Sequence, residues 1–374
     1  MLPSSKLLGL LAAAAAVVLL LHSQQLPGWD GKELLAGHQR AQAQPACRLQ
    51  DGGGAGGAGT FAPPLDYRAL FNSSRSLEVL ARVETGCSWE HSGQTSDLRI
   101  PPVLHFVHLP DAEQLISTAS AKGASFHLEW ALSCMKMYPR YEHLYWDHSA
   151  ARTLLERRYP SFLPIFDAFP FDMQRADSIR YFIMHRIGGV YFDADVLCYR
   201  PAEDLWAGAD VVLQGTQDPE FLASAVLASV PGHPFWMHTV DVLKQRFEQF
   251  RDELGHILDL TGPFMLRSAL KEFLFGSDGD ELNARVAGGT YEGPAPAGAN
   301  RSSVVRIHPQ GSYFTPCAWA DQDCHKKVAA MQRFGIVPPH MAGYHLYRGS
   351  WWGTAEGNPN SHDDKVGAAA SEGS

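Results

Sequence analysis

The stretch QRADSIRYFIMHRIGGVYFDADVLCYRP, from Gln174 to Pro201, decides how the rest of this chain is interpreted. Its first half has the spacing of a helix, because isoleucine recurs every fourth residue at Ile179, Ile183 and Ile187. The pair Gly188-Gly189 should end this helix, since glycine readily adopts the positive φ that a turn requires. We therefore predict a helix that stops at two glycines.

A short apolar run, Val190 to Phe192, follows the glycines and is predicted to be a buried strand. Asp193 and Asp195 come at its carboxyl end, which is the end at which open α/β sheets bind ligands. Residues two apart on a strand point to the same side, so the two carboxylates should converge. Converging carboxylates are costly unless a cation lies between them, and hard oxygen ligands suit Mg²⁺ or Mn²⁺.

Asp177 and Arg180 lie three residues apart and should share one face of the preceding helix. An exposed ion pair on a helix surface would explain them equally well and would be worth little. A bare D-x-D also occurs by chance in many proteins. The ordered set R-x-D-x-x-R, helix, Gly-Gly, apolar strand and D-x-D is far more specific, so we interpret the stretch as a functional site.

This ordered set resembles the sugar-nucleotide-binding region of the DxD glycosyltransferases of family 32. That family includes fungal Golgi initiating mannosyltransferases and inositol-phosphoceramide mannosyltransferases. The spacing is also similar to that of the large clostridial glucosylating toxins. The resemblance extends from about Ile100 to Trp352 and implies a GT-A fold, a single Rossmann-like α/β domain with a mostly parallel sheet. It further implies a transferase that retains the anomeric configuration of the sugar.

Length and composition indicate a globular protein with added terminal segments. The chain has 374 residues, of which 45% are apolar and 19% are charged. A net charge of −9 without a long basic run argues against a nucleic-acid partner. We expect four parts, listed here in chain order: a signal anchor or signal peptide at 1–22, a stem or linker at 23–99, the GT-A domain at 100–355 and a disordered tail at 356–374.

The amino terminus carries Lys6 and then an uninterrupted apolar run from Leu7 to Leu21. This run is short for a membrane span, which typically needs about 20 residues, and it fits the core of a signal peptide. A secreted or ER-lumenal protein therefore remains possible. The resemblance favours a type II anchor in the Golgi membrane, with the amino terminus cytosolic by the positive-inside tendency and the catalytic domain lumenal.

Sequons and cysteines agree with a lumenal domain. Asn72-Ser73-Ser74 and Asn300-Arg301-Ser302 are potential glycosylation sites. The six cysteines are an even number and can pair in an oxidising compartment, although sequence does not reveal their connectivity. Cys317 and Cys324 are near enough to close a small loop. Buried free thiols are the alternative.

Strands and helices are predicted to alternate along the remainder of the chain, as expected for one α/β domain. The predicted strands are Val103–Val107, Tyr141–Trp146, Asp210–Gln214 and Val304–His308. The predicted helices are Asp66–Glu84, Phe126–Met137, Pro234–Phe250 and one that opens at Thr261-Gly262-Pro263, with Thr261 as its N-cap. The segment Gly276–Asn300 is predicted to be a variable surface loop.

The resemblance assigns roles to residues outside the central stretch. Val107 and His108 stand at the end of the first strand, which in the family meets the nucleotide base; related sequences often carry tryptophan where His108 stands. Asp147 follows the second strand, and either belongs to the site or only caps the next helix. His105 is interpreted as a hydrogen-bonded core histidine rather than a ligand.

A closing motif is predicted near the carboxyl end, where 341–352 reads MAGYHLYRGSWW. His345, Ser350 and Trp351 match the family spacing of a histidine followed five and six residues later by Ser-Trp. A histidine can give Mn²⁺ a nitrogen ligand, and a hydroxyl or an indole N–H can hold a phosphate oxygen. The alternative is an apolar plug formed by Trp351 and Trp352.

Together the resemblance implies a metal held by Asp193, Asp195 and His345, and a transferred sugar held by Asp177 and Arg180. GDP-mannose is the expected donor, with UDP-galactose and UDP-N-acetylglucosamine as alternatives, and the acceptor is a glycan or a glycolipid. Two other classes remain open: a catalytically silent protein that binds glycans or nucleotide-sugars, and a metal-dependent hydrolase.

Overall fold

The structure is a computed structural model that describes residues 47, 71–89, 97–109, 125–215, 222–276, 290–294, 303–309, 313–318 and 321–346. All of them fall within the compact unit 45–374. Leu7–Leu21, Asn300, Ser350, Trp351 and the predicted tail lie outside the described residues, so the predictions made for them stay predictions. Among the helices that are described, none is both long and apolar enough to cross a bilayer.

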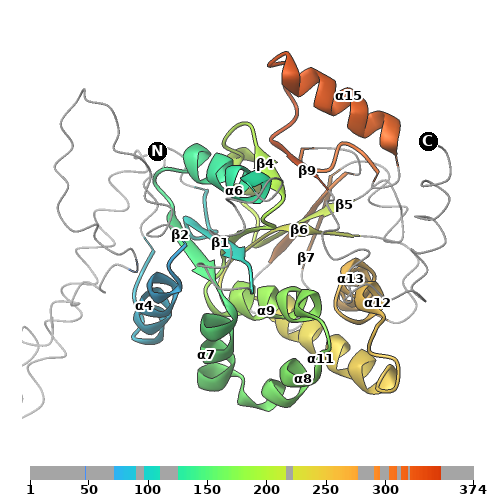
Figure 1. Ribbon diagram of the computed structural model, residues 1–374. Coiled ribbons are helices and arrows are strands. Elements are labelled where there is room, and N and C mark those ends of the chain that lie inside the picture. Colours follow the sequence, from blue (N-terminus) through green and yellow to red (C-terminus); the bar gives the residue numbers. More distant parts are fainter. Residues whose placement is uncertain are drawn as a thin grey trace, which may run out of the picture. The chain divides into compact units, whose positions relative to one another are not determined.

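A central sheet of seven strands lies within the described part of the chain, in the order β2-β1-β3-β6-β5-β8-β7 (Figure 1). β1, β2, β3, β5 and β8 run in one direction, whereas β6 and β7 run in the other. This confirms the predicted α/β class with a mostly parallel sheet. The strands are β1 Val103–Val107, β2 Glu142–Trp146, β3 Gly189–Phe192, β5 Val211–Gly215, β6 Leu222–Ser229, β7 Tyr291–Pro294 and β8 Val304–His308.

Two of these strands were not predicted. β7 lies inside Gly276–Asn300, which we had interpreted as a loop, and it pairs antiparallel with β8. β6 reads LASAVLAS, a run of small residues with no period-2 alternation, because it is buried on both faces in the middle of the sheet. Neither strand has the bounded apolar pattern by which the other strands were predicted.

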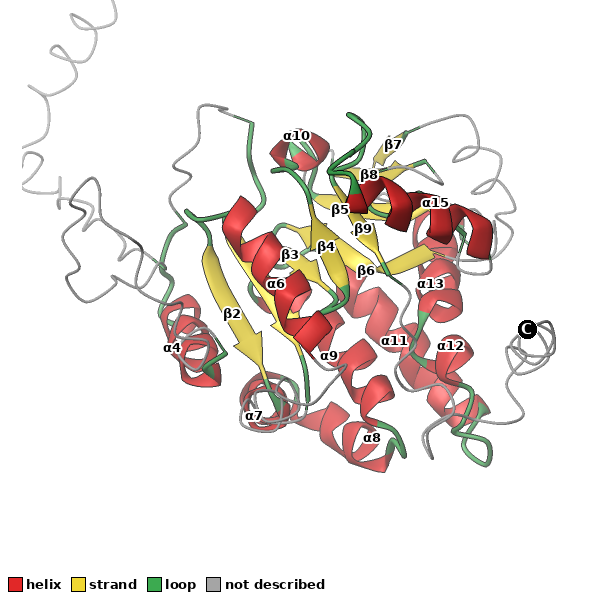
Figure 2. Ribbon diagram, turned by 45° about the horizontal axis from the view of Figure 1, so that its top comes forward, coloured by secondary structure: helices red, strands yellow, loops and turns green. Residues whose placement is uncertain are grey.

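Helices cover both faces of the sheet (Figure 2). Their side chains divide into two large apolar clusters, one with α7, α8, α9, α11 and α13, the other with α6 and α10. The helices are α4 Ser73–Glu84, α6 Ser125–Met137, α7 His148–Arg158, α8 Leu163–Ala168, α9 Asp172–Arg186, α10 Glu203–Trp206, α11 Pro234–Gln249, α12 Ile257–Leu260, α13 Pro263–Phe275 and α15 Gln322–Arg333.

Strand β3 shows how the layers are divided. Val190 and Phe192 pack in the cluster that contains α6, whereas Tyr191 packs in the cluster that contains α9. Alternate side chains of a strand point to opposite faces, so a continuous apolar run is what a doubly covered strand requires. The site residues that follow β3 are thus attached to a strand that is buried on both faces.

The predicted stop at two glycines is confirmed. Gly188 and Gly189 have φ values of 70° and 93°. They allow the chain to leave α9 and enter β3 directly, with the Gly188 carbonyl accepting a hydrogen bond from the buried His105 ring at 2.7 Å. Trp146 donates to the other ring nitrogen of His105 at 3.1 Å. His105 is therefore a fully hydrogen-bonded core histidine, as predicted, and burial lowers its pKa to about 4.

Three disulfides pair all six cysteines, so the alternative of buried free thiols is wrong. Cys317–Cys324 closes the predicted small loop. Cys134–Cys198 joins α6 to the strand β4, Val196–Cys198. Cys47–Cys87 lies beside α4, whose Val79 packs against β1 and β2. Part of the segment that we predicted as a stem therefore packs on the sheet.

Gly189 should be far less replaceable than Gly208, although both have positive φ. A Cβ atom at Gly189 would lie 2.7 Å from the Val103 carbonyl oxygen, whereas nothing lies within 4 Å of one at Gly208. Gly208→Ala should lower the unfolding free energy by the backbone strain alone, ~1–3 kcal/mol. Gly189→Ala should lose ~1–3 kcal/mol more through overpacking. Urea unfolding of both variants tests this, and equal losses would contradict the close approach.

Candidate active site

The two aspartates of the D-x-D sequence lie in a turn rather than on the strand. β3 ends at Phe192, and β4 begins at Val196. The amide of Val196 donates to the Asp193 carbonyl at 3.1 Å, and the Asp193 amide donates to Ala225 of β6 at 2.8 Å. The carboxylates converge because this turn folds the chain back. The alternation of side chains along a strand, which we had predicted as the cause of this convergence, does not apply here.

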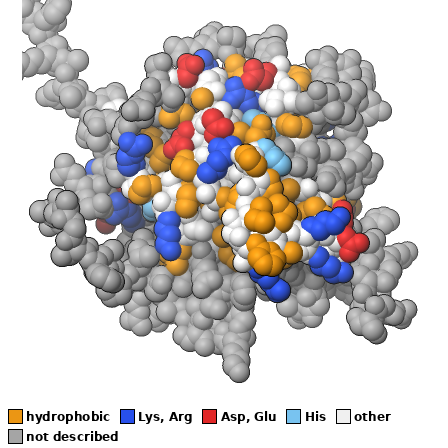
Figure 3. All heavy atoms as spheres, turned by 90° about the horizontal axis from the view of Figure 1, so that it is seen from above, with side chains coloured by type: hydrophobic (Ala, Val, Ile, Leu, Met, Phe, Trp, Pro, Cys, Tyr) orange, Lys and Arg blue, Asp and Glu red, His pale blue; other side chains and the backbone are white. Residues whose placement is uncertain are grey.

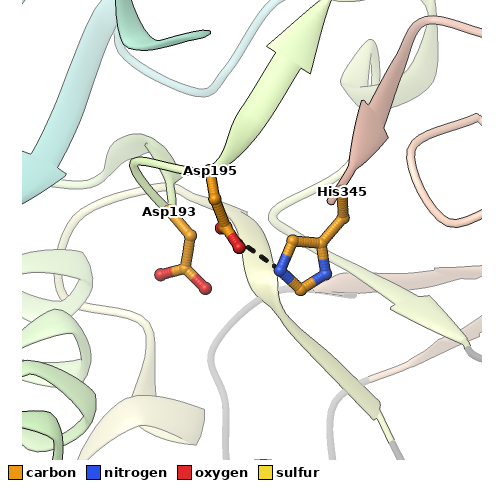
Figure 4. Close-up of side chains that lie close together, drawn as sticks. All are labelled: Asp193, Asp195 and His345. Carbon is orange, nitrogen blue, oxygen red and sulfur yellow. Dashed lines mark ion pairs between the residues drawn. The ribbon is translucent and has the colours of Figure 1, made fainter. Parts of the chain in front are cut away.

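A second, two-stranded sheet brings His345 to the same turn. β4 pairs antiparallel with β9, Gly343–His345, so that Val196 lies opposite His345. The amide after His345 also donates to the Asp195 carbonyl at 3.2 Å. One ligand atom from each of Asp193, Asp195 and His345 lies within 4.8 Å of the others. Figure 4 shows the three side chains projecting toward one another from the turn and from the end of β9.

The side chains of Asp193, Asp195 and His345 form a group that suits a divalent cation. Two carboxylates and one imidazole nitrogen are the donor types that Mn²⁺ accepts, and all three side chains are partly exposed. His345 Nε2 lies 3.3 Å from Asp195 Oδ1. Burial by itself lowers the pKa of His345, but the neighbouring Asp195 carboxylate outweighs it, so the pKa is raised. His345 and the Asp195 carboxylate, which would both bind the metal, therefore attract each other.

Asp177 and Arg180 are buried, with exposed fractions of 5% and 2%, so the alternative of a surface ion pair is wrong. They form an ion pair on α9. Arg180 also donates to the Ser224 carbonyl of β6 at 2.9 Å, and Asp193 Oδ1 lies 3.3 Å from the same nitrogen. The guanidinium therefore joins the helix to the D-x-D turn.

Tyr191 was missed by the sequence reasoning. Its hydroxyl donates to the Asp193 carboxylate, and its ring lies 4.9 Å from the Arg180 guanidinium carbon. Burial lowers the pKa of Arg180 and the nearby Asp193 and Tyr191 raise it, with a net rise. The signal available in the sequence was the spacing: Tyr191 stands two residues before Asp193, where side chains of an extended segment share one side.

Thr261 has a different role from the one predicted. The N-cap of α13 is Gly262, and the Thr261 hydroxyl instead donates to Asp177 Oδ2 at 3.0 Å. Tyr181 donates to the Thr261 carbonyl at 2.8 Å, which fixes the residue against α9. Burial raises the pKa of Asp177 to about 6 even though Arg180 and Thr261 favour its ionised form. No property of the sequence around Thr261 indicates a partner on α9.

The other predicted residues that the structure describes, Val107, His108 and Asp147, lie at the same edge of the sheet. The register of β1 with β3 pairs Leu104 with Val190, which by extension sets Val107 level with Asp193. His108 follows β1, and the Tyr145 hydroxyl donates to its carbonyl at 3.1 Å. Asp147 is the N-cap of α7 and accepts from the Ala150 amide at 2.8 Å, as the simpler interpretation expected.

Comparison with known proteins assigns the central stretch to a recognised region. Residues 128–212 match the family described as the glycosyltransferase sugar-binding region containing the DXD motif. Inositol phosphoceramide mannosyltransferase 2 of Schizosaccharomyces pombe is 35% identical over 134 residues, which are 36% of this chain and 38% of that protein. Mannosyl phosphorylinositol ceramide synthase SUR1 of Saccharomyces cerevisiae is 33% identical over 140 residues, 37% of this chain and 36% of that protein.

The predicted resemblance to DxD glycosyltransferases is confirmed by these matches. The chain aligns with less than two fifths of the length of those two relatives. A solved structure, PaToxG glycosyltransferase, is 16% identical, covers 50% of this chain and 74% of that one, and has a TM-score of 0.33, too weak a likeness to argue from. The α/β architecture with its mostly parallel sheet is consistent with the expected GT-A class.

Replacing Thr261 should raise the pKa of Asp177 further. Thr261→Val removes a donor to the ionised carboxylate, so the variant should lose about 1–2 kcal/mol of unfolding free energy at pH 7. The loss should shrink as pH falls from the raised pKa of Asp177 in the variant through about 6, its pKa in the folded wild type, because both proteins then hold the carboxyl protonated. Urea unfolding at several pH values measures this.

Thr261→Ser is the matched control, since it keeps the hydroxyl and should stay close to wild type at every pH. A deficit of Thr261→Val that does not change between pH 7 and pH 4 would mean that lost packing, and not the carboxylate, explains it.

Proposed function

We propose that this protein is a metal-dependent glycosyltransferase that moves a hexose from a nucleotide-sugar to an acceptor hydroxyl, retaining the anomeric configuration. The observation that carries the proposal is the convergence of Asp193, Asp195 and His345 on one point, directly beside the buried Arg180. The match of residues 128–212 to a sugar-binding DXD region supports it.

Asp193, Asp195 and His345 would hold the metal. Bound there, Mn²⁺ or Mg²⁺ would neutralise the charge of the donor diphosphate and orient it. Val107 and His108 are level with the D-x-D turn and would meet the nucleotide base, while Ser350 and Trp351 would close over the phosphates.

Asp177 and Arg180 are better placed to position the site than to touch the sugar. Arg180 contacts Asp193 directly, and both oxygens of Asp177 are engaged, one by Arg180 and the other by Thr261. Fixing the Asp193 carboxylate before the donor binds removes a cost of reorganisation from the reaction. We therefore propose them as positioning residues, a change from the expectation that they hold the sugar hydroxyls.

The reaction would proceed by attack from the side of the leaving group. The acceptor hydroxyl attacks the anomeric carbon, the bond from that carbon to the diphosphate oxygen breaks, and a glycosidic bond forms in its place. The proton of the hydroxyl passes to the departing phosphate oxygen. The fixed charges of Arg180 and of the D-x-D turn are in place throughout, which is how a preorganised site stabilises developing charge.

GDP-mannose is the proposed donor of a mannose residue, and an inositol-phosphate glycolipid is the proposed acceptor. The sugar and the acceptor follow the names of the relatives, which are mannosyltransferases of inositol phosphoceramide, whereas the guanosine nucleotide follows the expectation from the sequence. UDP-galactose and UDP-N-acetylglucosamine are the alternative donors. A silent binding protein would bind donor without turnover, and a hydrolase would release free sugar without needing an acceptor, so one assay of transfer and hydrolysis separates all three.

The Golgi lumen is the proposed location, with Leu7–Leu21 as a type II anchor. Three disulfides support an oxidising compartment. The asparagine of the first sequon, Asn72, is exposed, so it is accessible to modification.

Asp195→Asn should abolish metal-dependent transfer while leaving the fold intact, because it removes a ligand charge from a partly exposed side chain. Binding of Mn²⁺ in the presence of GDP, followed by electron paramagnetic resonance, should weaken at least tenfold, about 1.4 kcal/mol. His345→Gln should weaken Mn²⁺ binding less, because it replaces one neutral ligand with another.

The matched control is Asp147→Asn, at the same sheet edge, because asparagine also caps helices well. Normal turnover of Asp195→Asn, or full activity of the wild-type enzyme in EDTA, would contradict the metal assignment.

Asn72 should carry an N-linked glycan when the full chain is expressed in a eukaryotic cell. Digestion with an endoglycosidase should then increase electrophoretic mobility. Ser74→Ala should remove the modification without altering the Asn72 side chain, which caps α4 by accepting from the backbone amide of residue 74. An unmodified Asn72 together with an active cytosolic pool would exclude the lumenal location.

A further inference from the structure

The large hydrophobic side chains that the described residues leave exposed all lie in one short segment. They are Phe334, Ile336 and Val337, with exposed fractions of 80%, 55% and 38%. The segment Phe334–Val337, here called the apolar tip, follows α15 immediately. Figure 3 views the molecule from the side on which α15 lies in Figure 1, and hydrophobic side chains gather there beside Lys and Arg side chains. Exposed apolar clusters of this kind mark interaction surfaces.

Helix α15, which precedes the apolar tip, is packed against the rest of the domain. Val328 of α15 is buried against Met341 and Tyr344, and the Cys317–Cys324 disulfide ties the first turn of the helix to the preceding segment. His325 contacts Tyr344 as well, and Gln332 donates to the Tyr199 hydroxyl. The tip is therefore exposed at the end of a helix that is itself well packed.

Positive charge lies next to the apolar tip. On α15, Lys326 is paired with Asp323 at 3.5 Å, at the beginning of the helix. Lys327 and Arg333 are exposed and have no ion-pair partner within the described residues. An apolar tip flanked by unpaired cations combines the two attractions, burial and charge, by which peripheral elements bind an anionic lipid surface.

We propose that the apolar tip, with Lys327 and Arg333, contacts the surface of an anionic membrane. The chain continues from the tip through residues 338–342 into β9, which ends at His345, so this contact would bring the candidate metal ligands Asp193, Asp195 and His345 toward lipid headgroups. The membrane contact has one consequence that rests on the proposed function: an anionic glycolipid acceptor would reach the site from the plane of the membrane. The contact itself does not require the protein to be a transferase.

A fluorescent label on the tip tests the contact in the full-length protein. Every cysteine is in a disulfide, so Ile336→Cys supplies a single free thiol for an environment-sensitive dye. Arg251→Cys is the matched control, an exposed residue two positions after the end of α11, and α11 lies on the other side of the sheet from α15 in Figure 1. The protein is reconstituted in vesicles of phosphatidylcholine with phosphatidylinositol, with nitroxide-labelled acyl chains as quenchers.

The label at 336 should be quenched at least threefold more than the label at 251. Lys327→Glu combined with Arg333→Glu, or vesicles of phosphatidylcholine alone, should remove most of this difference. Equal quenching at both positions would overturn the proposal. So would energy transfer between labels at 336 on separate molecules, because a second copy of the chain would then be what covers the tip.

The consequence for catalysis is tested separately with Ile336→Ser. Transfer to a glycolipid embedded in vesicles should fall about tenfold, while transfer to its water-soluble headgroup should stay within twofold of wild type. An equal fall for both acceptors would overturn the link between the tip and the acceptor. If quenching is selective but no acceptor is ever glycosylated, the proposed function fails while the membrane contact stands.

Discussion

Arg180 places a permanent positive charge inside the protein, and the surroundings of this guanidinium set the arrangement of the site. A buried charge is tolerated only with partners, and removing one partner typically costs about 3–5 kcal/mol. Here the partners are Asp177 on the same helix, Asp193 beyond β3 and the Ser224 carbonyl of β6. Satisfying one side chain therefore fixes a helix, a turn and a strand relative to each other.

The connection between α9 and β3 makes this arrangement possible. Two glycines with positive φ let the chain reverse within two residues, and the space for one side chain at Gly189 is taken by the backbone of β1. The helix is thereby held against the strand that follows it, so Arg180 on α9 reaches the carboxylate at the strand's far end. The aspartates of the candidate metal site and the pair Asp177 and Arg180 therefore lie at the two ends of one continuous motif, and His345 reaches it from β9.

The sequence allowed most of the sheet and the aspartates of the site to be predicted, because both depend on local patterns. It did not allow Thr261 to be linked to Asp177, since a threonine before Gly-Pro has an adequate local explanation as a cap. β6 was missed because small residues in a doubly buried strand show no alternation. His345 was found only through a family motif, as nothing in its own neighbourhood signals a ligand.

The sequence by itself determined the order of helix, Gly-Gly, strand and D-x-D, because spacing, glycine conformation and strand burial are properties of neighbouring residues. It also determined the class of fold, through the alternation of patterns along the chain. Only the tertiary structure decided that Asp177 and Arg180 are buried rather than exposed, that the D-x-D turn meets β9, and that the apolar tip is left uncovered. Burial and convergence depend on contacts between segments far apart in sequence, and no local pattern encodes them.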